Sequence, residues 1–143
     1  MKRIGLFANH KGFSMVVVDL YRKKFTVLEV ISSSKPSYKI IKETLEKLKK
    51  IYKTNKVIHN NDIKLDNLQS FTLYPQELNL KGSIFQISAL CNDGILLLSP
   101  NTTELQREIN DFDEEIINHK VYALMLAITE IHINDPSAWL LNR

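Results

Sequence analysis

Three pairs of neighbouring asparagine and histidine residues are the groups in this sequence whose types could act together chemically. The pairs are Asn9-His10, His59-Asn60 and Asn118-His119. Neutral imidazoles are ligands for transition metals such as zinc or nickel. Amides beside imidazoles can also hydrogen-bond a nucleotide or a phosphate. If the fold brings the three pairs to one end of a sheet, they form a candidate site.

A plainer interpretation gives these residues local structural roles, and it is the one we favour. Asn9 opens a turn that ends at Gly12, where asparagine tolerates unusual backbone angles. Asn118 precedes a helical pattern that its side chain can cap. The histidines then need be no more than exposed loop residues. We therefore expect no metal site, with zinc as the alternative that calorimetry would test.

Acidic residues that could hold magnesium or manganese are scattered along the chain. The candidates are Asp19, Asp62 and Asp113. Hard divalent cations prefer oxygen ligands, so an active metal-dependent enzyme would need such carboxylates within a few ångströms of each other. No spacing in the sequence predicts that these three meet.

Lysines crowd residues 35 to 56, and they share that stretch with two tyrosines, Tyr38 and Tyr52. The candidate nucleic-acid-binding residues are Lys39, Lys42, Lys49 and Lys53. Stacking and charge on one helix could dock nucleic acid. A solvated helix face with interleaved Glu43 and Glu46 is the plainer interpretation, and we favour it.

Composition sets the class of protein. The chain has 143 residues, 44% hydrophobic and 24% charged, with a formal net charge of +3. We expect a single domain over residues 1–143 with one core. The only cysteine, Cys91, excludes a disulfide framework. The sequence shows no leader and no apolar stretch that could cross a bilayer, so we expect a cytoplasmic protein with no membrane partner.

The order of elements predicts an α/β fold. Val-rich and apolar runs indicate strands at 2–8, 13–20 and 25–31, joined by short turns as an antiparallel meander. Helical spacing of apolar residues over 37–54 and a strand at 56–59 then indicate a crossover to a parallel neighbour.

The second half is less regular. Its expected elements are a short strand at 70–74 before Pro75, a helix or strand at 84–90, a strand at 95–98, a helix capped by Asn101 with Glu104, and a last helix at 118–132. We place Val121, Leu124, Met125 and Ile128 on the inner face of that last helix.

The C-terminal half resembles the end of the nuclease domain of viral large terminases, which package DNA into capsids and cut it. The matching segments are ISALCNDGILLLSP (87–100), ELQREINDF (104–112) and NHKVYALMLAI (118–128). The resemblance implies a ribonuclease H-like mixed sheet, three antiparallel strands followed by parallel strands, flanked by helices.

The same resemblance implies carboxylates on the first strand, the fourth strand and the last helix, which together hold two magnesium or manganese ions. The sequence departs from this pattern at all three places. The first strand offers Phe7, Ala8 or Asn9; the fourth ends in His59-Asn60-Asn61, with Asp62 the nearest acid; the last helix offers Asn118, His119 and Tyr122. We therefore expect weak or no magnesium binding and no two-metal hydrolysis.

The resulting hypothesis is a non-catalytic relative of the terminase nuclease, of viral or virus-derived origin. It would bind DNA or act as an assembly subunit in DNA packaging. The sequence has no phosphate-binding loop of an ATPase and Met1 begins at the first strand, so we expect any motor or portal subunit to be a separate chain. The alternatives are an active endonuclease that uses other acids, and a structural module that forms homo-oligomers.

Overall fold

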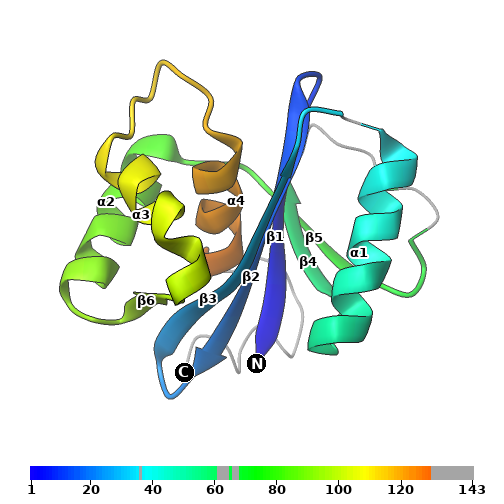
Figure 1. The fold of residues 1–143 in the computed structure, drawn as a ribbon, viewed down its shortest axis with the longest axis horizontal. Helices are drawn as coiled ribbons and strands as arrows, with labels where there is room; N and C mark the ends of the chain where they lie inside the picture. The colour runs from blue at the N-terminus through cyan, green and yellow to red at the C-terminus, as the bar shows by residue number, and fades with distance from the viewer. Residues whose placement is uncertain (36, 61–64, 66–67, 130–143) are drawn as a thin grey trace.

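A computed structural model, which describes residues 1–35, 37–60, 65 and 68–129, shows a central sheet with helices on both faces (Figure 1). Its strand order is β5-β4-β1-β2-β3-β6. Strands β1 (Lys2–Asn9), β2 (Gly12–Tyr21) and β3 (Lys24–Ser33) are antiparallel. Strands β4 (Lys56–Asn60), β5 (Thr72–Gln76) and β6 (Leu96–Leu98) pair in parallel with their neighbours. The predicted ribonuclease H-like mixed sheet is confirmed.

Two apolar clusters, one on each face of the sheet, hold the helices in place. Helix α1 (Tyr38–Tyr52) buries Ile41, Leu45 and Leu48 against one face. Helix α4 (His119–Ile128) lies on the other face beside α2 (Leu80–Asn92) and α3 (Thr103–Asn110) (Figure 1). Successive strand side chains point to opposite faces, so β1 and β2 supply both clusters from nearly continuous apolar runs. None of the helices within the described ranges is both long and apolar enough to span a membrane.

Helix α4 packs directly on β1 because Gly5 leaves room for it. A Cβ added at Gly5 would lie 2.0 Å from the carbonyl oxygen of Ala123 and 2.6 Å from the backbone nitrogen of Ala127. All residues from Val121 to Ile128 are buried. The predicted inward positions are therefore confirmed, and the whole circumference of the helix is enclosed.

Several element boundaries differ from the sequence predictions. Strand β5 continues through Pro75, which an edge strand tolerates because it has a hydrogen-bonded neighbour on one side only. Residues 84–90 lie inside helix α2, whose N-cap Asn79 accepts a hydrogen bond from the backbone N–H of Gly82 at 3.1 Å.

The predicted cap of helix α3 at Asn101 is wrong. A 3₁₀ turn at Pro100–Thr102 comes first, so Thr102 is the N-cap, and its side chain makes no capping bond. Its hydroxyl donates to the carbonyl of Ser99 at 2.8 Å instead.

Helix α4 also ends earlier than predicted, at Ile128 rather than at residue 132, because Thr129 is extended. The guanidinium of buried Arg3 donates to the carbonyls of Ala127 and Thr129 at this end. A side chain from β1 thus satisfies carbonyl groups that a helix leaves open at its C-terminus.

Candidate functional site

Asn9 and His119 meet where β1 ends and α4 begins. Asn9 Oδ1 accepts a hydrogen bond from the backbone N–H of Lys11 at 2.9 Å and lies 2.8 Å from Nε2 of His119. A backbone N–H can only donate, so the first bond fixes which end of the amide is the oxygen. Nε2 of His119 therefore carries a proton, and the neutral ring keeps its lone pair on Nδ1.

The surroundings of His119 favour its neutral form. Burial lowers the pKa of His119, and the nearby Lys11 ammonium lowers this pKa further. The ring of Phe7 lies edge-on to the His119 ring, with ring centroids 5.4 Å apart. The Phe7 ring also packs against the Tyr122 ring, with centroids 4.9 Å apart. This part of the site presents uncharged groups packed by aromatic rings.

Asn60 joins β4 to β1 beyond the last paired residues of their ladder, Leu6 and His59. Its Oδ1 accepts from the backbone N–H of Ala8 at 3.1 Å, and its Nδ2 donates to the carbonyl of Ala8 at 2.9 Å. The buried amide thus replaces a peptide group of the neighbouring strand. A carboxylate cannot donate, so it could satisfy only one of these two backbone groups.

His59 is buried on the other face of the sheet from Asn60, because adjacent strand residues alternate. It shares its parity with Val57, which packs in the cluster around α1, whereas His119 opens the helix on the opposite face. Burial lowers the pKa of His59, and its hydrogen bond to the Asn60 carbonyl, 2.9 Å from Nδ1, opposes that shift.

The remaining members of the three pairs have separate positions. His10 is exposed in the β1–β2 turn. Asn118 is the N-cap of α4, as predicted, and its Oδ1 accepts from the backbone N–H of Val121 at 3.0 Å. In the part of the chain that the structure describes, no three histidine, cysteine, aspartate or glutamate side chains are grouped to hold a metal ion. The structure therefore does not bring the three imidazoles together.

A pocket of about 400 Å³ opens beside His119, between the start of β2, the end of β3 and the helices α3 and α4. Its polar lining includes Lys11, Ser14, Ser32, Glu108, His119 and Lys120. The hydroxyls of Ser14 and Ser32 are 2.6 Å apart. Glu108 Oε1 lies 3.5 Å from Lys120 Nζ, while its buried Oε2 has no hydrogen-bond partner in the described ranges.

Sequence reasoning did not single out Lys11, Glu108 or Lys120. Each is a charged residue in a polar stretch, and nothing in its local pattern distinguishes it from a solvated side chain. The pocket joins residues from a turn and two helices, which only the packing of α3 against α4 brings together.

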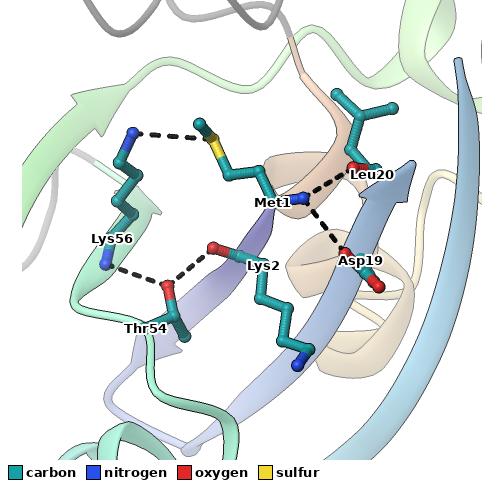
Figure 2. Close-up of polar contacts among 6 residues, drawn as sticks. All are labelled: Met1, Lys2, Asp19, Leu20, Thr54 and Lys56. Carbon is teal, nitrogen blue, oxygen red and sulfur yellow. Dashed lines mark hydrogen bonds and ion pairs between the residues drawn. The ribbon is translucent and has the colours of Figure 1, made fainter. Parts of the chain in front are cut away.

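Two of the alternative catalytic acids, Asp19 and Asp113, lie in the described part of the chain, and each has a local contact of its own. Asp19 lies at the far end of β2, paired in register with Lys2, seven positions along β1 from Asn9 and so about 23 Å away at 3.3 Å per residue. There Asp19 forms an ion pair with the N-terminal ammonium, whose nitrogen lies 3.2 Å from Asp19 Oδ1 (Figure 2). Asp113 holds a turn, since its Oδ1 accepts from the backbone N–H of Glu115 at 3.0 Å. Asp62 lies outside the described residues.

Helix α1 uses part of its predicted nucleic-acid-binding side for internal contacts. Lys49 Nζ donates to the carbonyl of Ser70 at 3.2 Å and lies 5.3 Å from the centre of the Phe71 ring. The Tyr52 hydroxyl donates to Glu29, and burial together with this carboxylate raises the pKa of Tyr52 to about 12. Of the other named lysines, Lys39 and Lys53 are exposed and Lys42 is half-buried.

Comparison with solved structures identifies the fold. The large terminase nuclease domain of Thermus phage P74-26 matches with a TM-score of 0.74 and 16% identity, over 94% of this chain and 82% of that one. The large terminase nuclease from thermophilic phage G20c, solved with bound zinc, gives a TM-score of 0.70 and 18% identity over 89% and 79% of the two chains. The chain has the fold of a phage large terminase nuclease domain.

A longer protein shares this fold as part of its chain. The large terminase of another thermophilic bacteriophage, in complex with ATP-gamma-S, matches with a TM-score of 0.73 and 14% identity, over 87% of this chain but only 38% of that one. No protein-family model matches the sequence, and no curated protein matches it. The likeness to terminase nucleases is therefore one of structure.

Proposed function

We propose that this protein is a non-catalytic, terminase-nuclease-like subunit that binds nucleic acid in viral or virus-derived DNA packaging. The observation that carries the proposal is the hydrogen bond between Asn9 and His119. It joins β1 to α4, two of the places where the terminase resemblance implies metal-binding carboxylates. The groups that meet there are uncharged.

The amide oxygens nearby support the same proposal. The Oδ1 atoms of Asn9, Asn60 and Asn118 each accept a backbone N–H. A magnesium ion gives up its hydration shell only for strong oxygen ligands, and carboxylates supply both the oxygen and the charge. Neutral amides that already accept backbone N–H groups supply no negative charge to compensate the ion for its lost hydration.

A nuclease assay with Mn²⁺ on supercoiled plasmid tests the loss of catalysis. We expect no conversion to nicked or linear DNA at millimolar Mn²⁺. Robust cleavage that disappears in Asp62→Asn would establish the alternative, an active enzyme with a different acid. The control variant Asp93→Asn, an exposed acid in the turn before β6, should leave any such cleavage unchanged.

The partner that we propose is a separate ATPase motor or portal subunit. A partner that binds ATP is supported by the longer phage terminase, which was solved with ATP-gamma-S and has this fold over 38% of its chain. Co-purification with co-expressed candidate motor and portal proteins from the same genome tests the pairing. Retention of neither would leave the protein without the packaging role.

A structural or oligomerisation role is the second candidate, and exposed apolar side chains favour it. Phe85 on α2 is 76% exposed and Ile116 in the loop before α4 is 66% exposed. Large exposed apolar side chains often mark interfaces between proteins. Light scattering on the protein and on Phe85→Ser would show a homo-oligomer that dissociates in the variant; a monomer in both cases excludes this candidate.

A further inference from the structure

Cationic residues from four separate elements gather at one end of the sheet, along the edge formed by the strand termini where β1 and β4 begin. The antiparallel strand β2 ends at this edge, β3 begins there, and α1 ends just before β4. We call this surface the basic edge; its residues are Lys2, Arg22, Lys23, Lys24, Lys53 and Lys56. It lies at the bottom of the sheet in Figure 1, opposite the β1–β2 turn, which follows Asn9.

These six cations have no carboxylate partner among the residues that the structure describes. Asp19 is beside them, but it is occupied by the N-terminal ammonium, which also donates to the carbonyl of Leu20 at 2.7 Å (Figure 2). Lys56 Nζ lies 3.5 Å from Met1 Sδ. The basic edge therefore carries charge that the fold itself does not neutralise.

The strands hold two of these lysines at fixed positions. The Thr54 hydroxyl donates to the carbonyl of Lys2 at 2.6 Å and lies 3.4 Å from the backbone nitrogen of Lys56 (Figure 2). This contact ties the start of β4 to the start of β1. The backbones at Lys2 and Lys56 are therefore held together before any ligand binds, which limits the ordering that binding would require.

The β2–β3 turn keeps cations where the backbone disfavours them. Tyr21 pairs with Lys24, so the loop has two residues, Arg22 and Lys23, with φ values of 50° and 62°. Such turns prefer Asn-Gly, because side chains with a Cβ are strained in the left-handed region. The Arg22 guanidinium lies 5.2 Å from the centre of the Tyr21 ring, which is 64% exposed. Strain retained at an exposed, charged position points to a function.

The other candidate surfaces are less suited to a polyanion. The loop between α3 and α4 lies at the opposite end of the sheet and is acidic. Its four exposed acids are Asp111, Asp113, Glu114 and Glu115. On α1, exposed Glu43 and Glu46 interleave with the lysines. At the basic edge the cations lie beside an exposed tyrosine, and the neighbouring Asp19 already pairs with the N-terminal ammonium.

We propose that the basic edge binds the phosphodiester backbone of nucleic acid, on the side of the sheet away from Asn9 and His119. This inference rests on the nucleic-acid-binding part of the proposed function. From β4 to β3 the edge spans three strand spacings, about 14 Å. Duplex DNA carries one charge per roughly 1.7 Å of its axis, so several phosphates lie within reach of the six cations. Contacts to phosphates carry no base information, so binding does not depend on sequence.

The test is a salt series of fluorescence anisotropy titrations with the full chain and a labelled duplex of about 20 base pairs. Each neutralised phosphate contributes about −0.9 to the slope of log K against log salt, so we expect a wild-type slope of about −3 to −5. The variant Arg22→Asn/Lys23→Gly should lose about 2 units of this slope and bind at least roughly tenfold more weakly near 100 mM salt.

The same variant separates lost binding from lost structure. Asn-Gly suits a turn with two positive φ angles, so its melting temperature should rise by roughly 3 to 6 °C. The matched control, Lys39→Gln/Lys42→Gln, also removes two charges but lies near the start of α1. Its slope should stay close to that of the wild type.

The outcomes distinguish the two proposals. If the wild type does not bind DNA at low salt, both the nucleic-acid role and the basic edge fail. If the wild type binds, and Arg22→Asn/Lys23→Gly keeps its slope while the α1 control loses it, only the basic edge fails. Equal binding of polyglutamate with the same loss in the variant would assign the surface to an acidic protein instead and overturn the inference.

Discussion

Three asparagine side chains at the end of the sheet accept backbone N–H groups with their amide oxygens. Replacing each of them by aspartate would nevertheless have different effects. The oxygens of Asn9 and Asn118 only accept, from the backbone of Lys11 and Val121. Asn60 both accepts from and donates to Ala8. Aspartate can therefore replace the first two without losing a hydrogen bond, but not the third.

Asn60→Asp should lower the free energy of unfolding by about 1–3 kcal/mol at pH 7, because an anion would face the Ala8 carbonyl. This repulsion and burial raise the folded-state pKa of the new carboxyl above its unfolded value near 3.9. The penalty is then smallest below that value and grows as pH rises through the folded-state pKa. Urea unfolding at several pH values checks this, with exposed Asn55→Asp as control. A pH-independent difference would contradict it.

Asn9→Asp should reverse the contribution of His119 to the pH dependence of stability. In the wild type the pKa of His119 is lowered, so its contribution is intact above the unfolded value near 6.5 and is lost as pH falls below it. A carboxylate at position 9 would pair with the protonated ring and raise that pKa, so the variant gains stability relative to the wild type as pH falls from about 7 towards about 5. NMR titration of the His119 ring protons measures the shift; an unchanged pKa would sink the assignment of this contact.

At the scale of elements, the position of α4 depends on a close approach to β1. Gly5 lies against the backbone of Ala123 and Ala127. A Cβ at position 5 would clash with backbone atoms, which cannot rotate away as a flexible side chain could. The helix cannot shift away from β1 easily, because it is buried on all sides from Val121 to Ile128.

Gly5→Ala should therefore destabilise the protein by about 2–4 kcal/mol, in the range of overpacked cores with backbone shifts. Chemical denaturation monitored by circular dichroism measures the change. Gly94→Ala is a suitable control: Gly94 has a φ of +70°, but an added Cβ would meet no atom of the described residues within 4 Å. It should cost only about 1 kcal/mol. Equal losses in the two variants would mean that α4 does not rest on β1 as closely as described.

At the scale of the whole molecule, the fold brings together positions 9 and 119, which are 110 residues apart. The resemblance to terminase nucleases implies, as a hypothesis, that both positions correspond to a metal site. Their side chains already meet at hydrogen-bond distance, so two carboxylates placed there would lie within reach of one ion.

The double variant Asn9→Asp/His119→Asp should accordingly bind Mn²⁺, whereas the wild type should not. Without metal its two like charges destabilise the fold; with Mn²⁺ at about a hundred times its dissociation constant, binding restores about 2.7 kcal/mol. Thermal unfolding with and without Mn²⁺ measures both effects. Asn9→Asp/Asp113→Asn, which leaves one new carboxylate and no added net charge, serves as the comparison and should show no metal-dependent shift.

Local patterns were sufficient where neighbours in sequence decide the structure. Apolar runs and turn residues predicted β1 to β4 and α1, and Asn118 was recognised as a cap because its partner, Val121, is three residues away. The cap of α3 was misplaced, since the 3₁₀ turn begun by Pro100 shifts the helix start by a residue. Asp19 was a candidate acid by type alone, and the register of β2 removes it from the Asn9 end.

By itself the sequence determined the mixed α/β class and most of the order of strands and helices. It did so because periodicity and side-chain type are properties of short segments. Only the tertiary structure decided that His59 and His119 belong to opposite faces and that cations from four elements lie at one end of the sheet. It also decided that the Asn60 side-chain amide bonds the Ala8 backbone as a peptide group of a neighbouring strand would. Those facts depend on strand order and register, which are set by packing between residues far apart in the chain.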